Sequence, residues 1–207
     1  MNKLPLSTKN FPTINFLLVG VGGQGTIMAS NILAELGIRI GYDVKQAEVH
    51  GMSQRGGSVT SNLRWAKQVF SPVIPRGEAD VLIGFEKLEA ARFADYLRPG
   101  GIALINDHVI VPVTVTSSGG VYPTDSDLHR IIEAATPRSH WLDGIGLAEK
   151  AGDAKAANTV ILGALSAVMD IPDEHWIEAI KARIPAKQLE LNLSAFKTGK
   201  LAISVNT

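Results

Sequence analysis

The sequence predicts an α/β fold in which helices lie on both faces of one mixed sheet. Short apolar runs alternate with segments whose apolar residues recur at helical intervals, which is typical of a layered α/β chain. A glycine-rich turn joins the first run to the first helical segment. The chain has 207 residues, of which 45% are hydrophobic, so it is long enough to bury a substantial core.

Runs that are apolar or rich in β-branched residues predict the strands. The run before the glycines is apolar apart from one asparagine, as in a buried strand. Residues 109–116 follow the preceding run too closely for a helical crossover, so a mixed sheet is expected rather than a purely parallel one. The predicted strands are residues 14–19, 43–49, 58–66, 79–85, 102–106, 109–116 and 140–143.

Segments with apolar residues three or four positions apart predict the helices. In the first of them Ile27, Leu33, Leu36 and Ile40 lie at helical intervals. An Arg-Pro-Gly-Gly sequence ends the second, and either Asp125 or Ser126 is expected to cap the third. The predicted helices are residues 26–40, 86–96, 127–135, 156–169, 173–183 and 187–201.

The chain carries no internal repeat, low-complexity segment or long linker, which predicts a single domain over residues 1–207. Its core is expected at about 14–200, with 1–13 as an N-terminal extension. Twenty basic and twenty acidic residues cancel, so neither nucleic acid nor a membrane is expected as a partner. No apolar run is long enough for a membrane span or a signal peptide, and a cytoplasmic protein is expected.

The absence of cysteine excludes several kinds of chemistry on this chain. A chain without cysteine forms no disulfide, offers no thiol nucleophile and supplies no thiolate to an iron–sulfur cluster. The five histidines are scattered without the spacing of metal ligands, so no metal site is expected. His50 alone adjoins a motif and is kept as a lesser candidate. No catalytic residue is predicted.

Gly20, Gly22 and Gly25 have the G-x-G-x-x-G spacing between a strand and a helix, which favours a Rossmann-like domain. Free backbone N–H groups and the helix dipole favour an anion at such a turn. A dinucleotide site also needs an acidic residue about 20 positions on, near Glu48. The alternative, a strand-to-helix turn that binds no nucleotide, is equally compatible with this local pattern.

Two further features make the turn unlike an ordinary dinucleotide site. Gly23 and Gln24 complete it, so a side-chain amide stands inside the loop. Glu48 is followed closely by His50 and Gly51, where an adenosine pocket needs no further glycine.

A second unusual loop contains Gln54, Arg55, Gly56 and Gly57. Its arginine can form two parallel hydrogen bonds with a phosphate or carboxylate, and its glycines allow close approach of another backbone. The alternative is a hairpin loop with a solvated arginine. Because strand ends gather at one edge of an open α/β sheet, the two glycine loops are expected to form one surface.

Other polar residues have simpler explanations. Asn106, Asp107 and His108 follow a strand and are expected in a capping turn, although the same edge of the sheet is open to them. Glu86 and Lys87 begin a helix, where an acidic residue suits the dipole. Lys150 and Lys155 are expected in a solvated loop.

Four blocks, taken in order, resemble the γ-type component of 2-oxoacid:ferredoxin oxidoreductases over about residues 14–200. The form of residues 52–57 most resembles the β subunit of the indolepyruvate members. The four blocks are GVGGQG (20–25), HGMSQRGGSV (50–59), ADVLIGFEKLEAAR (79–92) and AANTVILGAL (156–165).

The resemblance implies an accessory subunit that is inactive alone, in an enzyme that decarboxylates arylpyruvates, forms the aryl-acetyl-CoA and passes electrons to ferredoxin. Thiamine diphosphate, Mg and [4Fe-4S] clusters would then lie on a catalytic alpha subunit, because this chain has neither cysteine nor a Gly-Asp-Gly thiamine motif. The resemblance also implies a coenzyme A site formed in part by residues 20–25 and 54–57.

Two other functions stay open at this point. A stand-alone NAD(P)-binding Rossmann protein, such as a dehydrogenase, would bind its nucleotide in isolation, although 207 residues leave little room for a substrate domain. A scaffold whose glycine loops contact only protein would bind no small ligand.

Overall fold

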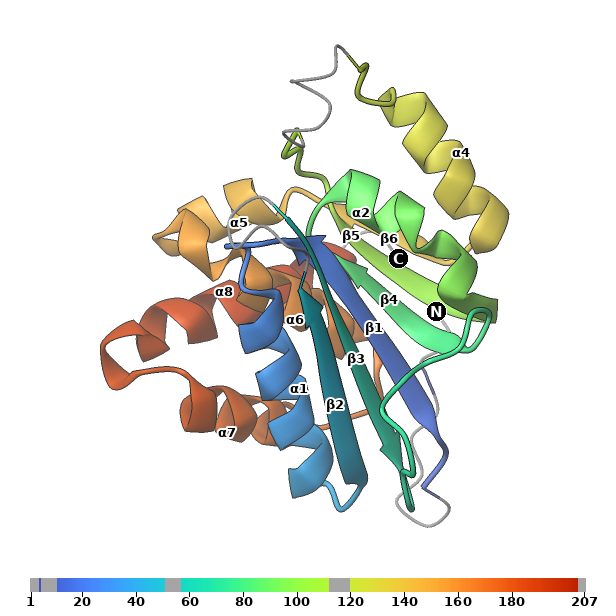
Figure 1. Cartoon of the computed structure of the whole chain (residues 1–207). Coiled ribbons are helices and arrows are strands. Elements are labelled where there is room, and N and C mark those ends of the chain that lie inside the picture. Colours follow the sequence, from blue (N-terminus) through green and yellow to red (C-terminus); the bar gives the residue numbers. More distant parts are fainter. Residues whose placement is uncertain (1–3, 5–10, 51–56, 112–119, 205–207) are drawn as a thin grey trace.

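The computed structural model describes residue 4 and residues 11–50, 57–111 and 120–204. Its centre is a six-stranded sheet with the order β2-β3-β1-β4-β5-β6 (Figure 1). The strands are β1 (Ile14–Val21), β2 (Asp43–His50), β3 (Ser58–Ala66), β4 (Ala79–Gly84), β5 (Leu97–Asn106) and β6 (Ser139–Leu142).

Helices fill most of the sequence between and after the strands. The first part of the chain has α1 (Thr26–Arg39), α2 (Lys87–Arg92) and the 3₁₀ helix η1 (Ala94–Tyr96). The second part has α4 (Asp125–Ala135), α5 (Gly144–Ala151), η2 (Ala154–Ala156), α6 (Ala157–Val168), α7 (Asp173–Arg183) and α8 (Ala186–Ser204). In the described part of the chain, no helix combines the length and the apolar character needed to cross a membrane.

The sheet is mixed, as predicted, but for a different reason from the one the sequence suggested. Strand β3 pairs antiparallel with both β1 and β2, whereas β1, β4, β5 and β6 are parallel neighbours. The predicted strand at 109–116 is wrong at residues 109–111, which form no strand, and residues 112–116 lie outside the described residues. The antiparallel member therefore lies between the first two strands and not at the end of the sheet.

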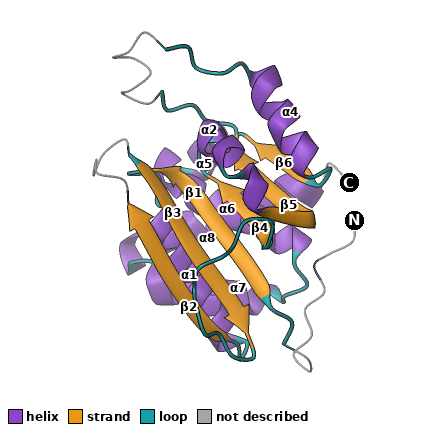
Figure 2. Cartoon of the chain, turned by 45° about the vertical axis from the view of Figure 1, so that its right-hand side comes forward, coloured by secondary structure: helices purple, strands orange, loops and turns teal. Residues whose placement is uncertain are grey.

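Two apolar clusters lie on the two faces of the sheet. Phe16 and Leu18 of β1 point to the face covered by α1, α6, α7 and α8. Leu17 and Val19 point to the other face, where α2, η1 and α4 cover β4 and β5. Figure 2 shows that the second layer of helices does not extend over β2 and β3.

The structure corrects several boundaries. The predicted helix 86–96 divides into α2 and η1, because the chain must reverse within a few residues to begin β5 at Leu97. Strand β5 runs through the Arg-Pro-Gly-Gly sequence by means of a shifted register, with Gly100 at φ 77°. The N-cap of α4 is Thr124, whose side chain accepts a hydrogen bond from the Asp127 N–H. The predicted caps, Asp125 and Ser126, are wrong. Leu4, in the expected extension, is buried against the core.

Helix α5 was not predicted, although its signals are present in the sequence. Two glycines in its first turn lower its helix propensity and hide the pattern. The Asp143 side chain caps it by accepting from the Gly146 N–H, and Gly152 follows its last turn at φ 133°. Helix α5 helps form the site described next.

Candidate functional site

The glycine turn, residues 20–25, connects β1 to α1 at the carboxyl edge of the parallel strands. Gly25 is the N-cap of α1 at φ 78°, and Gly23 has φ 104°, so both occupy backbone conformations that side chains disfavour. No side chain caps α1, and its first turn contains no acidic residue. The first N–H groups of a 14-residue helix are therefore left without an intrahelical partner, which suits an anion.

Gln24 fastens the turn to the sheet. Its Oε1 accepts from the Val21 N–H at 2.8 Å, and its Nε2 donates to the Phe85 carbonyl oxygen at 2.8 Å. A Cβ at Gly20 would lie 2.9 Å from this Oε1, so glycine is needed there for close packing. The amide that seemed out of place in a dinucleotide loop thus has a structural role.

Two buried asparagines continue this amide network. Asn106 donates from Nδ2 to the same Phe85 carbonyl oxygen at 3.1 Å and accepts at Oδ1 from the Gly144 N–H at 2.9 Å. Asn158 of α6 donates to the Gly25 carbonyl oxygen at 3.3 Å. These amides connect the ends of β4 and β5 and the starts of α1, α5 and α6 without introducing a charge.

A pocket of about 430 Å³ opens beside the glycine turn. It is lined by Gly22, Gly23, Gln24 and Gly25, and also by Asn106, His108 and Lys155 among others. In the described part of the chain Lys155 forms no ion pair. The pocket thus brings the N-cap of α1, Gly25, together with a lysine and a histidine, and this combination suits a phosphate or carboxylate group.

Gly57, the last residue of the second glycine loop, reaches the same edge of the sheet. The Gly22 N–H donates to the Gly57 carbonyl oxygen at 2.9 Å, and Gly20 pairs with Val59 across β1 and β3. A second pocket, of about 350 Å³, lies on this side of the turn and is lined by Thr26, Ile27 and Val59 among others. Gln54, Arg55 and Gly56 lie outside the described residues.

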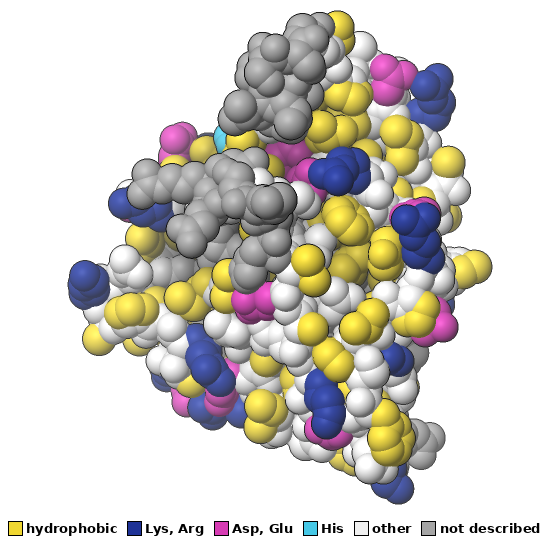
Figure 3. Space-filling view, viewed as in Figure 1, with side chains coloured by type: hydrophobic (Ala, Val, Ile, Leu, Met, Phe, Trp, Pro, Cys, Tyr) yellow, Lys and Arg dark blue, Asp and Glu magenta, His cyan; other side chains and the backbone are white. Residues whose placement is uncertain are grey.

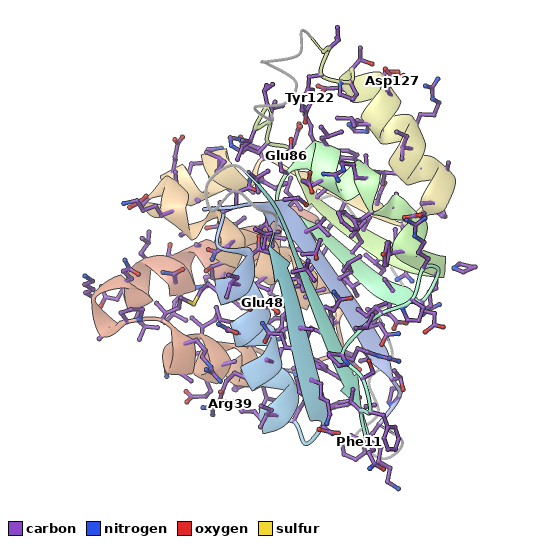
Figure 4. All side chains as sticks on the ribbon, viewed as in Figure 1. Phe11, Arg39, Glu48, Glu86, Tyr122 and Asp127 are labelled. Atoms are coloured by element: carbon purple, nitrogen blue, oxygen red, sulfur yellow. The ribbon has the colours of Figure 1, made fainter. Side chains whose placement is uncertain are left out.

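Glu48 does not occupy the position of a ribose-binding carboxylate. Strand β3 lies between β1 and β2, which places Glu48 two strands, or about 10 Å, from β1. Its carboxylate accepts from Gln46 Nε2 at 2.8 Å, on the side of β2 that faces α1 (Figure 4). His50 ends β2 opposite Val59, and its side chain lies outside the described residues.

Three charged side chains at the start of α2 are buried, with exposed fractions of 1% for Glu86, 5% for Lys87 and 3% for Glu89. Glu86 caps the helix at the Glu89 N–H and accepts from the Tyr122 hydroxyl at 2.5 Å (Figure 4). Glu89 accepts from the Ser58 hydroxyl at 2.5 Å.

Lys87 donates to two carboxylates, at 3.0 Å to Asp107 and at 2.6 Å to Asp125. Lys87, Asp107 and Asp125 thus form a triad that joins α2 to the segment after β5 and to the first residue of α4. His108 and Ile110, in the segment after β5, line the 430 Å³ pocket. Sequence reasoning assigned Glu86 and Lys87 to the helix dipole alone and missed these long-range contacts.

Two groups near the start of α2, Lys87 and Tyr122, have raised pKa values. Burial disfavours the Lys87 ammonium, but its hydrogen bonds to Asp125 and Asp107 outweigh burial and raise its pKa. Burial and the hydrogen bond to Glu86 together raise the pKa of Tyr122 far above its ordinary value. Both groups therefore keep their protons through the physiological range, and the triad acts as a structural clamp.

Asn106 and His108, expected in a capping turn, and Lys155, expected in a solvated loop, line the pocket. The prediction of a capping turn holds as well, because Asn106 satisfies the first N–H of α5. Lys155 lies in η2, and its position near the glycines depends on contacts between segments far apart in the sequence. Among the described residues, no group of three or more histidines and carboxylates could hold a metal ion.

Comparison with known proteins shows which family this chain resembles over most of its length. The model of the pyruvate ferredoxin/flavodoxin oxidoreductase family matches residues 15–202. Indolepyruvate oxidoreductase subunit IorB of Thermococcus kodakarensis is 38% identical over 188 residues, which cover 89% of this chain and 93% of that protein. Ketoisovalerate oxidoreductase subunit VorA of Methanothermobacter thermautotrophicus is 28% identical over 94% of this chain but only 37% of its own length.

A solved structure shows the same fold. The γ subunit of a keto/oxoacid ferredoxin oxidoreductase from Geobacter sulfurreducens superposes with a TM-score of 0.68 at 25% identity, covering 93% of this chain and 99% of that one. The resemblance drawn from the four sequence blocks is therefore confirmed, and it is favoured over a stand-alone NAD(P)-binding protein. This chain belongs to the pyruvate ferredoxin/flavodoxin oxidoreductase family.

Proposed function

We propose that this chain is the accessory beta subunit of an indolepyruvate:ferredoxin oxidoreductase. In this proposal a catalytic alpha subunit carries thiamine diphosphate, Mg and the iron–sulfur clusters, decarboxylates an arylpyruvate and reduces ferredoxin. The observation that carries the proposal is the similarity to subunit IorB, which extends over 93% of that protein.

The residues of this chain do not fit the redox cofactors. Cluster ligation by cysteine is excluded because the chain has none, and no Gly-Asp-Gly sequence is present to bind thiamine diphosphate. We therefore assign no redox or decarboxylation step to this chain. Its own contribution is a binding surface that serves the complex.

We propose that the surface at the glycine turn binds coenzyme A. Gly22, Gly23, Gln24 and Gly25 line the pocket, Gly20 allows the close packing of the turn, and the bonds of Gln24 hold the turn in place. Lys155 across the pocket supplies a cation for a phosphate group.

Within the same proposal, Gln54, Arg55, Gly56 and Gly57 also contribute to the coenzyme A site, with Arg55 as a second cation. Gly57 supports this part of the proposal through its hydrogen bond with Gly22.

The experiment purifies the complex through a tag on this chain and compares it with the chain alone. The complex should reduce ferredoxin with indolepyruvate and coenzyme A. The isolated chain should neither reduce ferredoxin nor bind thiamine diphosphate. Turnover by the isolated chain, free of other subunits, would overturn the proposal. So would NAD- or NADP-dependent turnover by that chain.

A second arm tests the coenzyme A site with Arg55→Ala in the assembled complex. A charged hydrogen bond to phosphate contributes about 1.5 to 3 kcal/mol, so the Michaelis constant for coenzyme A should rise roughly ten- to a hundredfold. That for the oxoacid should stay unchanged. Loss of assembly with unaltered coenzyme A kinetics would instead favour the scaffold function.

A further inference from the structure

The buried carboxylate of Glu86 joins two chain segments to the start of α2. Ile110 belongs to the segment that follows β5, and its N–H donates to Glu86 Oε1 at 3.3 Å. Tyr122 belongs to the segment that leads into α4, and its hydroxyl donates to the same oxygen at 2.5 Å (Figure 4). The other oxygen, Oε2, accepts from the Glu89 N–H at 2.8 Å. One carboxylate therefore holds both segments against α2.

The next residue, Lys87, joins the same two segments. Its Nζ donates to Asp107 of the first segment and to Asp125 at the end of the second. Its backbone N–H donates to the His108 carbonyl oxygen at 3.2 Å. Two neighbouring residues of opposite charge thus bind the same pair of segments, through side chains and main chain alike.

The first segment contributes alternate residues to the 430 Å³ pocket. His108 and Ile110 line the pocket, whereas Val109 and Val111 are 40% and 43% exposed. The bonds from the start of α2 reach the main chain of the two lining residues themselves, at the carbonyl oxygen of one and the N–H of the other. Loss of these bonds would therefore release a part of the pocket lining.

Stability alone is a weak reason for placing charges here. The side chain of Lys87 is only 7% exposed, and the desolvation of a buried ion pair offsets most of its attraction. Apolar side chains of similar volume would fill the same space at no such cost. They would not fix the direction of the groups that they meet, whereas charged hydrogen bonds do. Directional bonds suit a lining whose position matters to a ligand.

We propose that Glu86 and Lys87 are positioning residues of the coenzyme A site, which keep His108 and Ile110 in the place that the bound coenzyme requires. Neither Glu86 nor Lys87 lines the pocket, so both act through the residues that they hold. A binding site loses affinity when a residue that lines it is displaced by about 1 Å. The inference rests on the proposed coenzyme A site and deepens it.

The first experiment replaces Lys87 by methionine in the assembled complex. The side chains of Asp107 and Asp125 are 48% and 69% exposed, so water replaces the lysine as their partner and the chain should still fold. Figure 3 agrees, since side chains of both charges adjoin on the surface near α2. The Michaelis constant for coenzyme A should rise about three- to tenfold, while kcat and the constant for indolepyruvate stay within about twofold.

Lys87→Arg tests whether the cation itself sets the position. A guanidinium keeps donors for both carboxylates, so this variant should hold the constant for coenzyme A within about twofold of the unaltered complex. A role in stability alone would not produce a change in one Michaelis constant that the conservative variant reverses.

Arg98→Met is the matched control, because it takes a cation from a carboxylate at the opposite end of the same two strands. Arg98 Nε donates to Asp80 at 2.5 Å where β4 and β5 begin, whereas the pocket lies where these strands end. The Asp80 side chain is only 13% exposed, so this variant should lower the melting temperature at least as much as Lys87→Met. It should leave the constant for coenzyme A unchanged.

Hydrogen exchange measures the position of the lining without coenzyme A. In Lys87→Met, amide exchange in peptides that cover residues 106–111 should be at least about threefold faster than in Arg98→Met. Glu86→Gln provides a second variant, because its single amide oxygen leaves one of the two backbone N–H donors without an acceptor. It should speed exchange in the same peptides and raise the constant for coenzyme A about two- to fivefold.

Three results would overturn the positioning role. The first is unaltered coenzyme A kinetics in both Lys87→Met and Glu86→Gln, in a complex where Lys155→Ala raises the constant. The second is an equal rise in Arg98→Met, which would indicate a general loss of stability. The third is unaltered exchange of residues 106–111 in both α2 variants. Failure of the coenzyme A site would appear separately, as an unaltered constant in Lys155→Ala as well, and would overturn both proposals.

Discussion

The side-chain Nε2 of Gln24 donates a 2.8 Å hydrogen bond to the backbone carbonyl oxygen of Phe85. This bond ties the glycine turn after β1 to the residue that follows β4, the neighbouring parallel strand. Oε1 of the same side chain accepts from the Val21 N–H. One amide therefore sets the position of the turn that lines the pocket.

Replacing Gln24 should destabilise the chain measurably. Gln24→Leu leaves the Val21 N–H, in a buried residue, without its acceptor, and we expect a loss of about 1 to 3 kcal/mol in the free energy of unfolding. Urea titration of the isolated chain measures it. The matched control is Gln188→Leu on the exposed part of α8, which should change stability by less than about 0.5 kcal/mol. Equal values for the two variants would show that the Gln24 bonds do not fix the turn.

Gly25 should tolerate alanine less well than Gly23. Both have positive φ, but a Cβ at Gly25 would lie 2.5 Å from Asn158 Nδ2, whereas a Cβ at Gly23 meets no heavy atom within 4 Å. Gly23→Ala then reports strain alone, about 1 to 2 kcal/mol. Gly25→Ala adds a clash with α6 and should lower the melting temperature further. Identical melting temperatures would contradict the contact between the turn and Asn158.

The hydroxyl of Tyr122 should contribute to stability, and that of Tyr42 should not. Tyr122→Phe removes a donor from the buried Glu86 carboxylate and should cost about 1 to 2 kcal/mol. Tyr42→Phe removes a buried hydroxyl that has no partner among the described residues, so it should be neutral or stabilising. Urea titration of both variants provides the comparison. A larger loss for Tyr42→Phe would contradict this assignment of the two hydroxyls.

His140 should make stability depend on pH in mild acid. Burial and then the nearby Arg138 charge lower its pKa below 6.5, so the unfolded chain binds the proton more readily than the folded chain. Its contribution to stability is complete above pH 6.5 and declines as the pH falls through the lowered pKa. His140→Asn should flatten this part of the curve of melting temperature against pH. An unchanged curve would show that other groups produce the acid dependence.

Much of the fold could be predicted from the sequence because local patterns determine it. The buried run before the glycines and the apolar α6 are both visible in short windows of sequence. The position of β3 between β1 and β2 is not, since strand order depends on contacts between residues far apart in the chain. For this reason Glu48 was placed next to a nucleotide site that the sheet order does not allow.

The candidate site was predictable in part for the same reason. The glycines predict a turn that needs positive φ and close packing. In the structure Gly23 and Gly25 have positive φ, and Gly20 is closely packed. Lys155 and His108 come from distant segments and have no local signature. The buried charges of α2 were equally hidden, because Asp125 lies 38 residues from the lysine that it pairs with.

The kinetics of Lys155→Ala in the assembled complex test the central claim most directly, namely that the glycine turn and the facing cation bind coenzyme A. Lys155 is exposed, so its bond to a phosphate is partly screened and worth roughly 0.7 to 1.4 kcal/mol. The Michaelis constant for coenzyme A should rise about three- to tenfold while that for indolepyruvate stays constant, and Lys150→Ala, on the exposed end of α5, should change neither. An unchanged constant for coenzyme A, or an equal rise for both substrates, would contradict the claim.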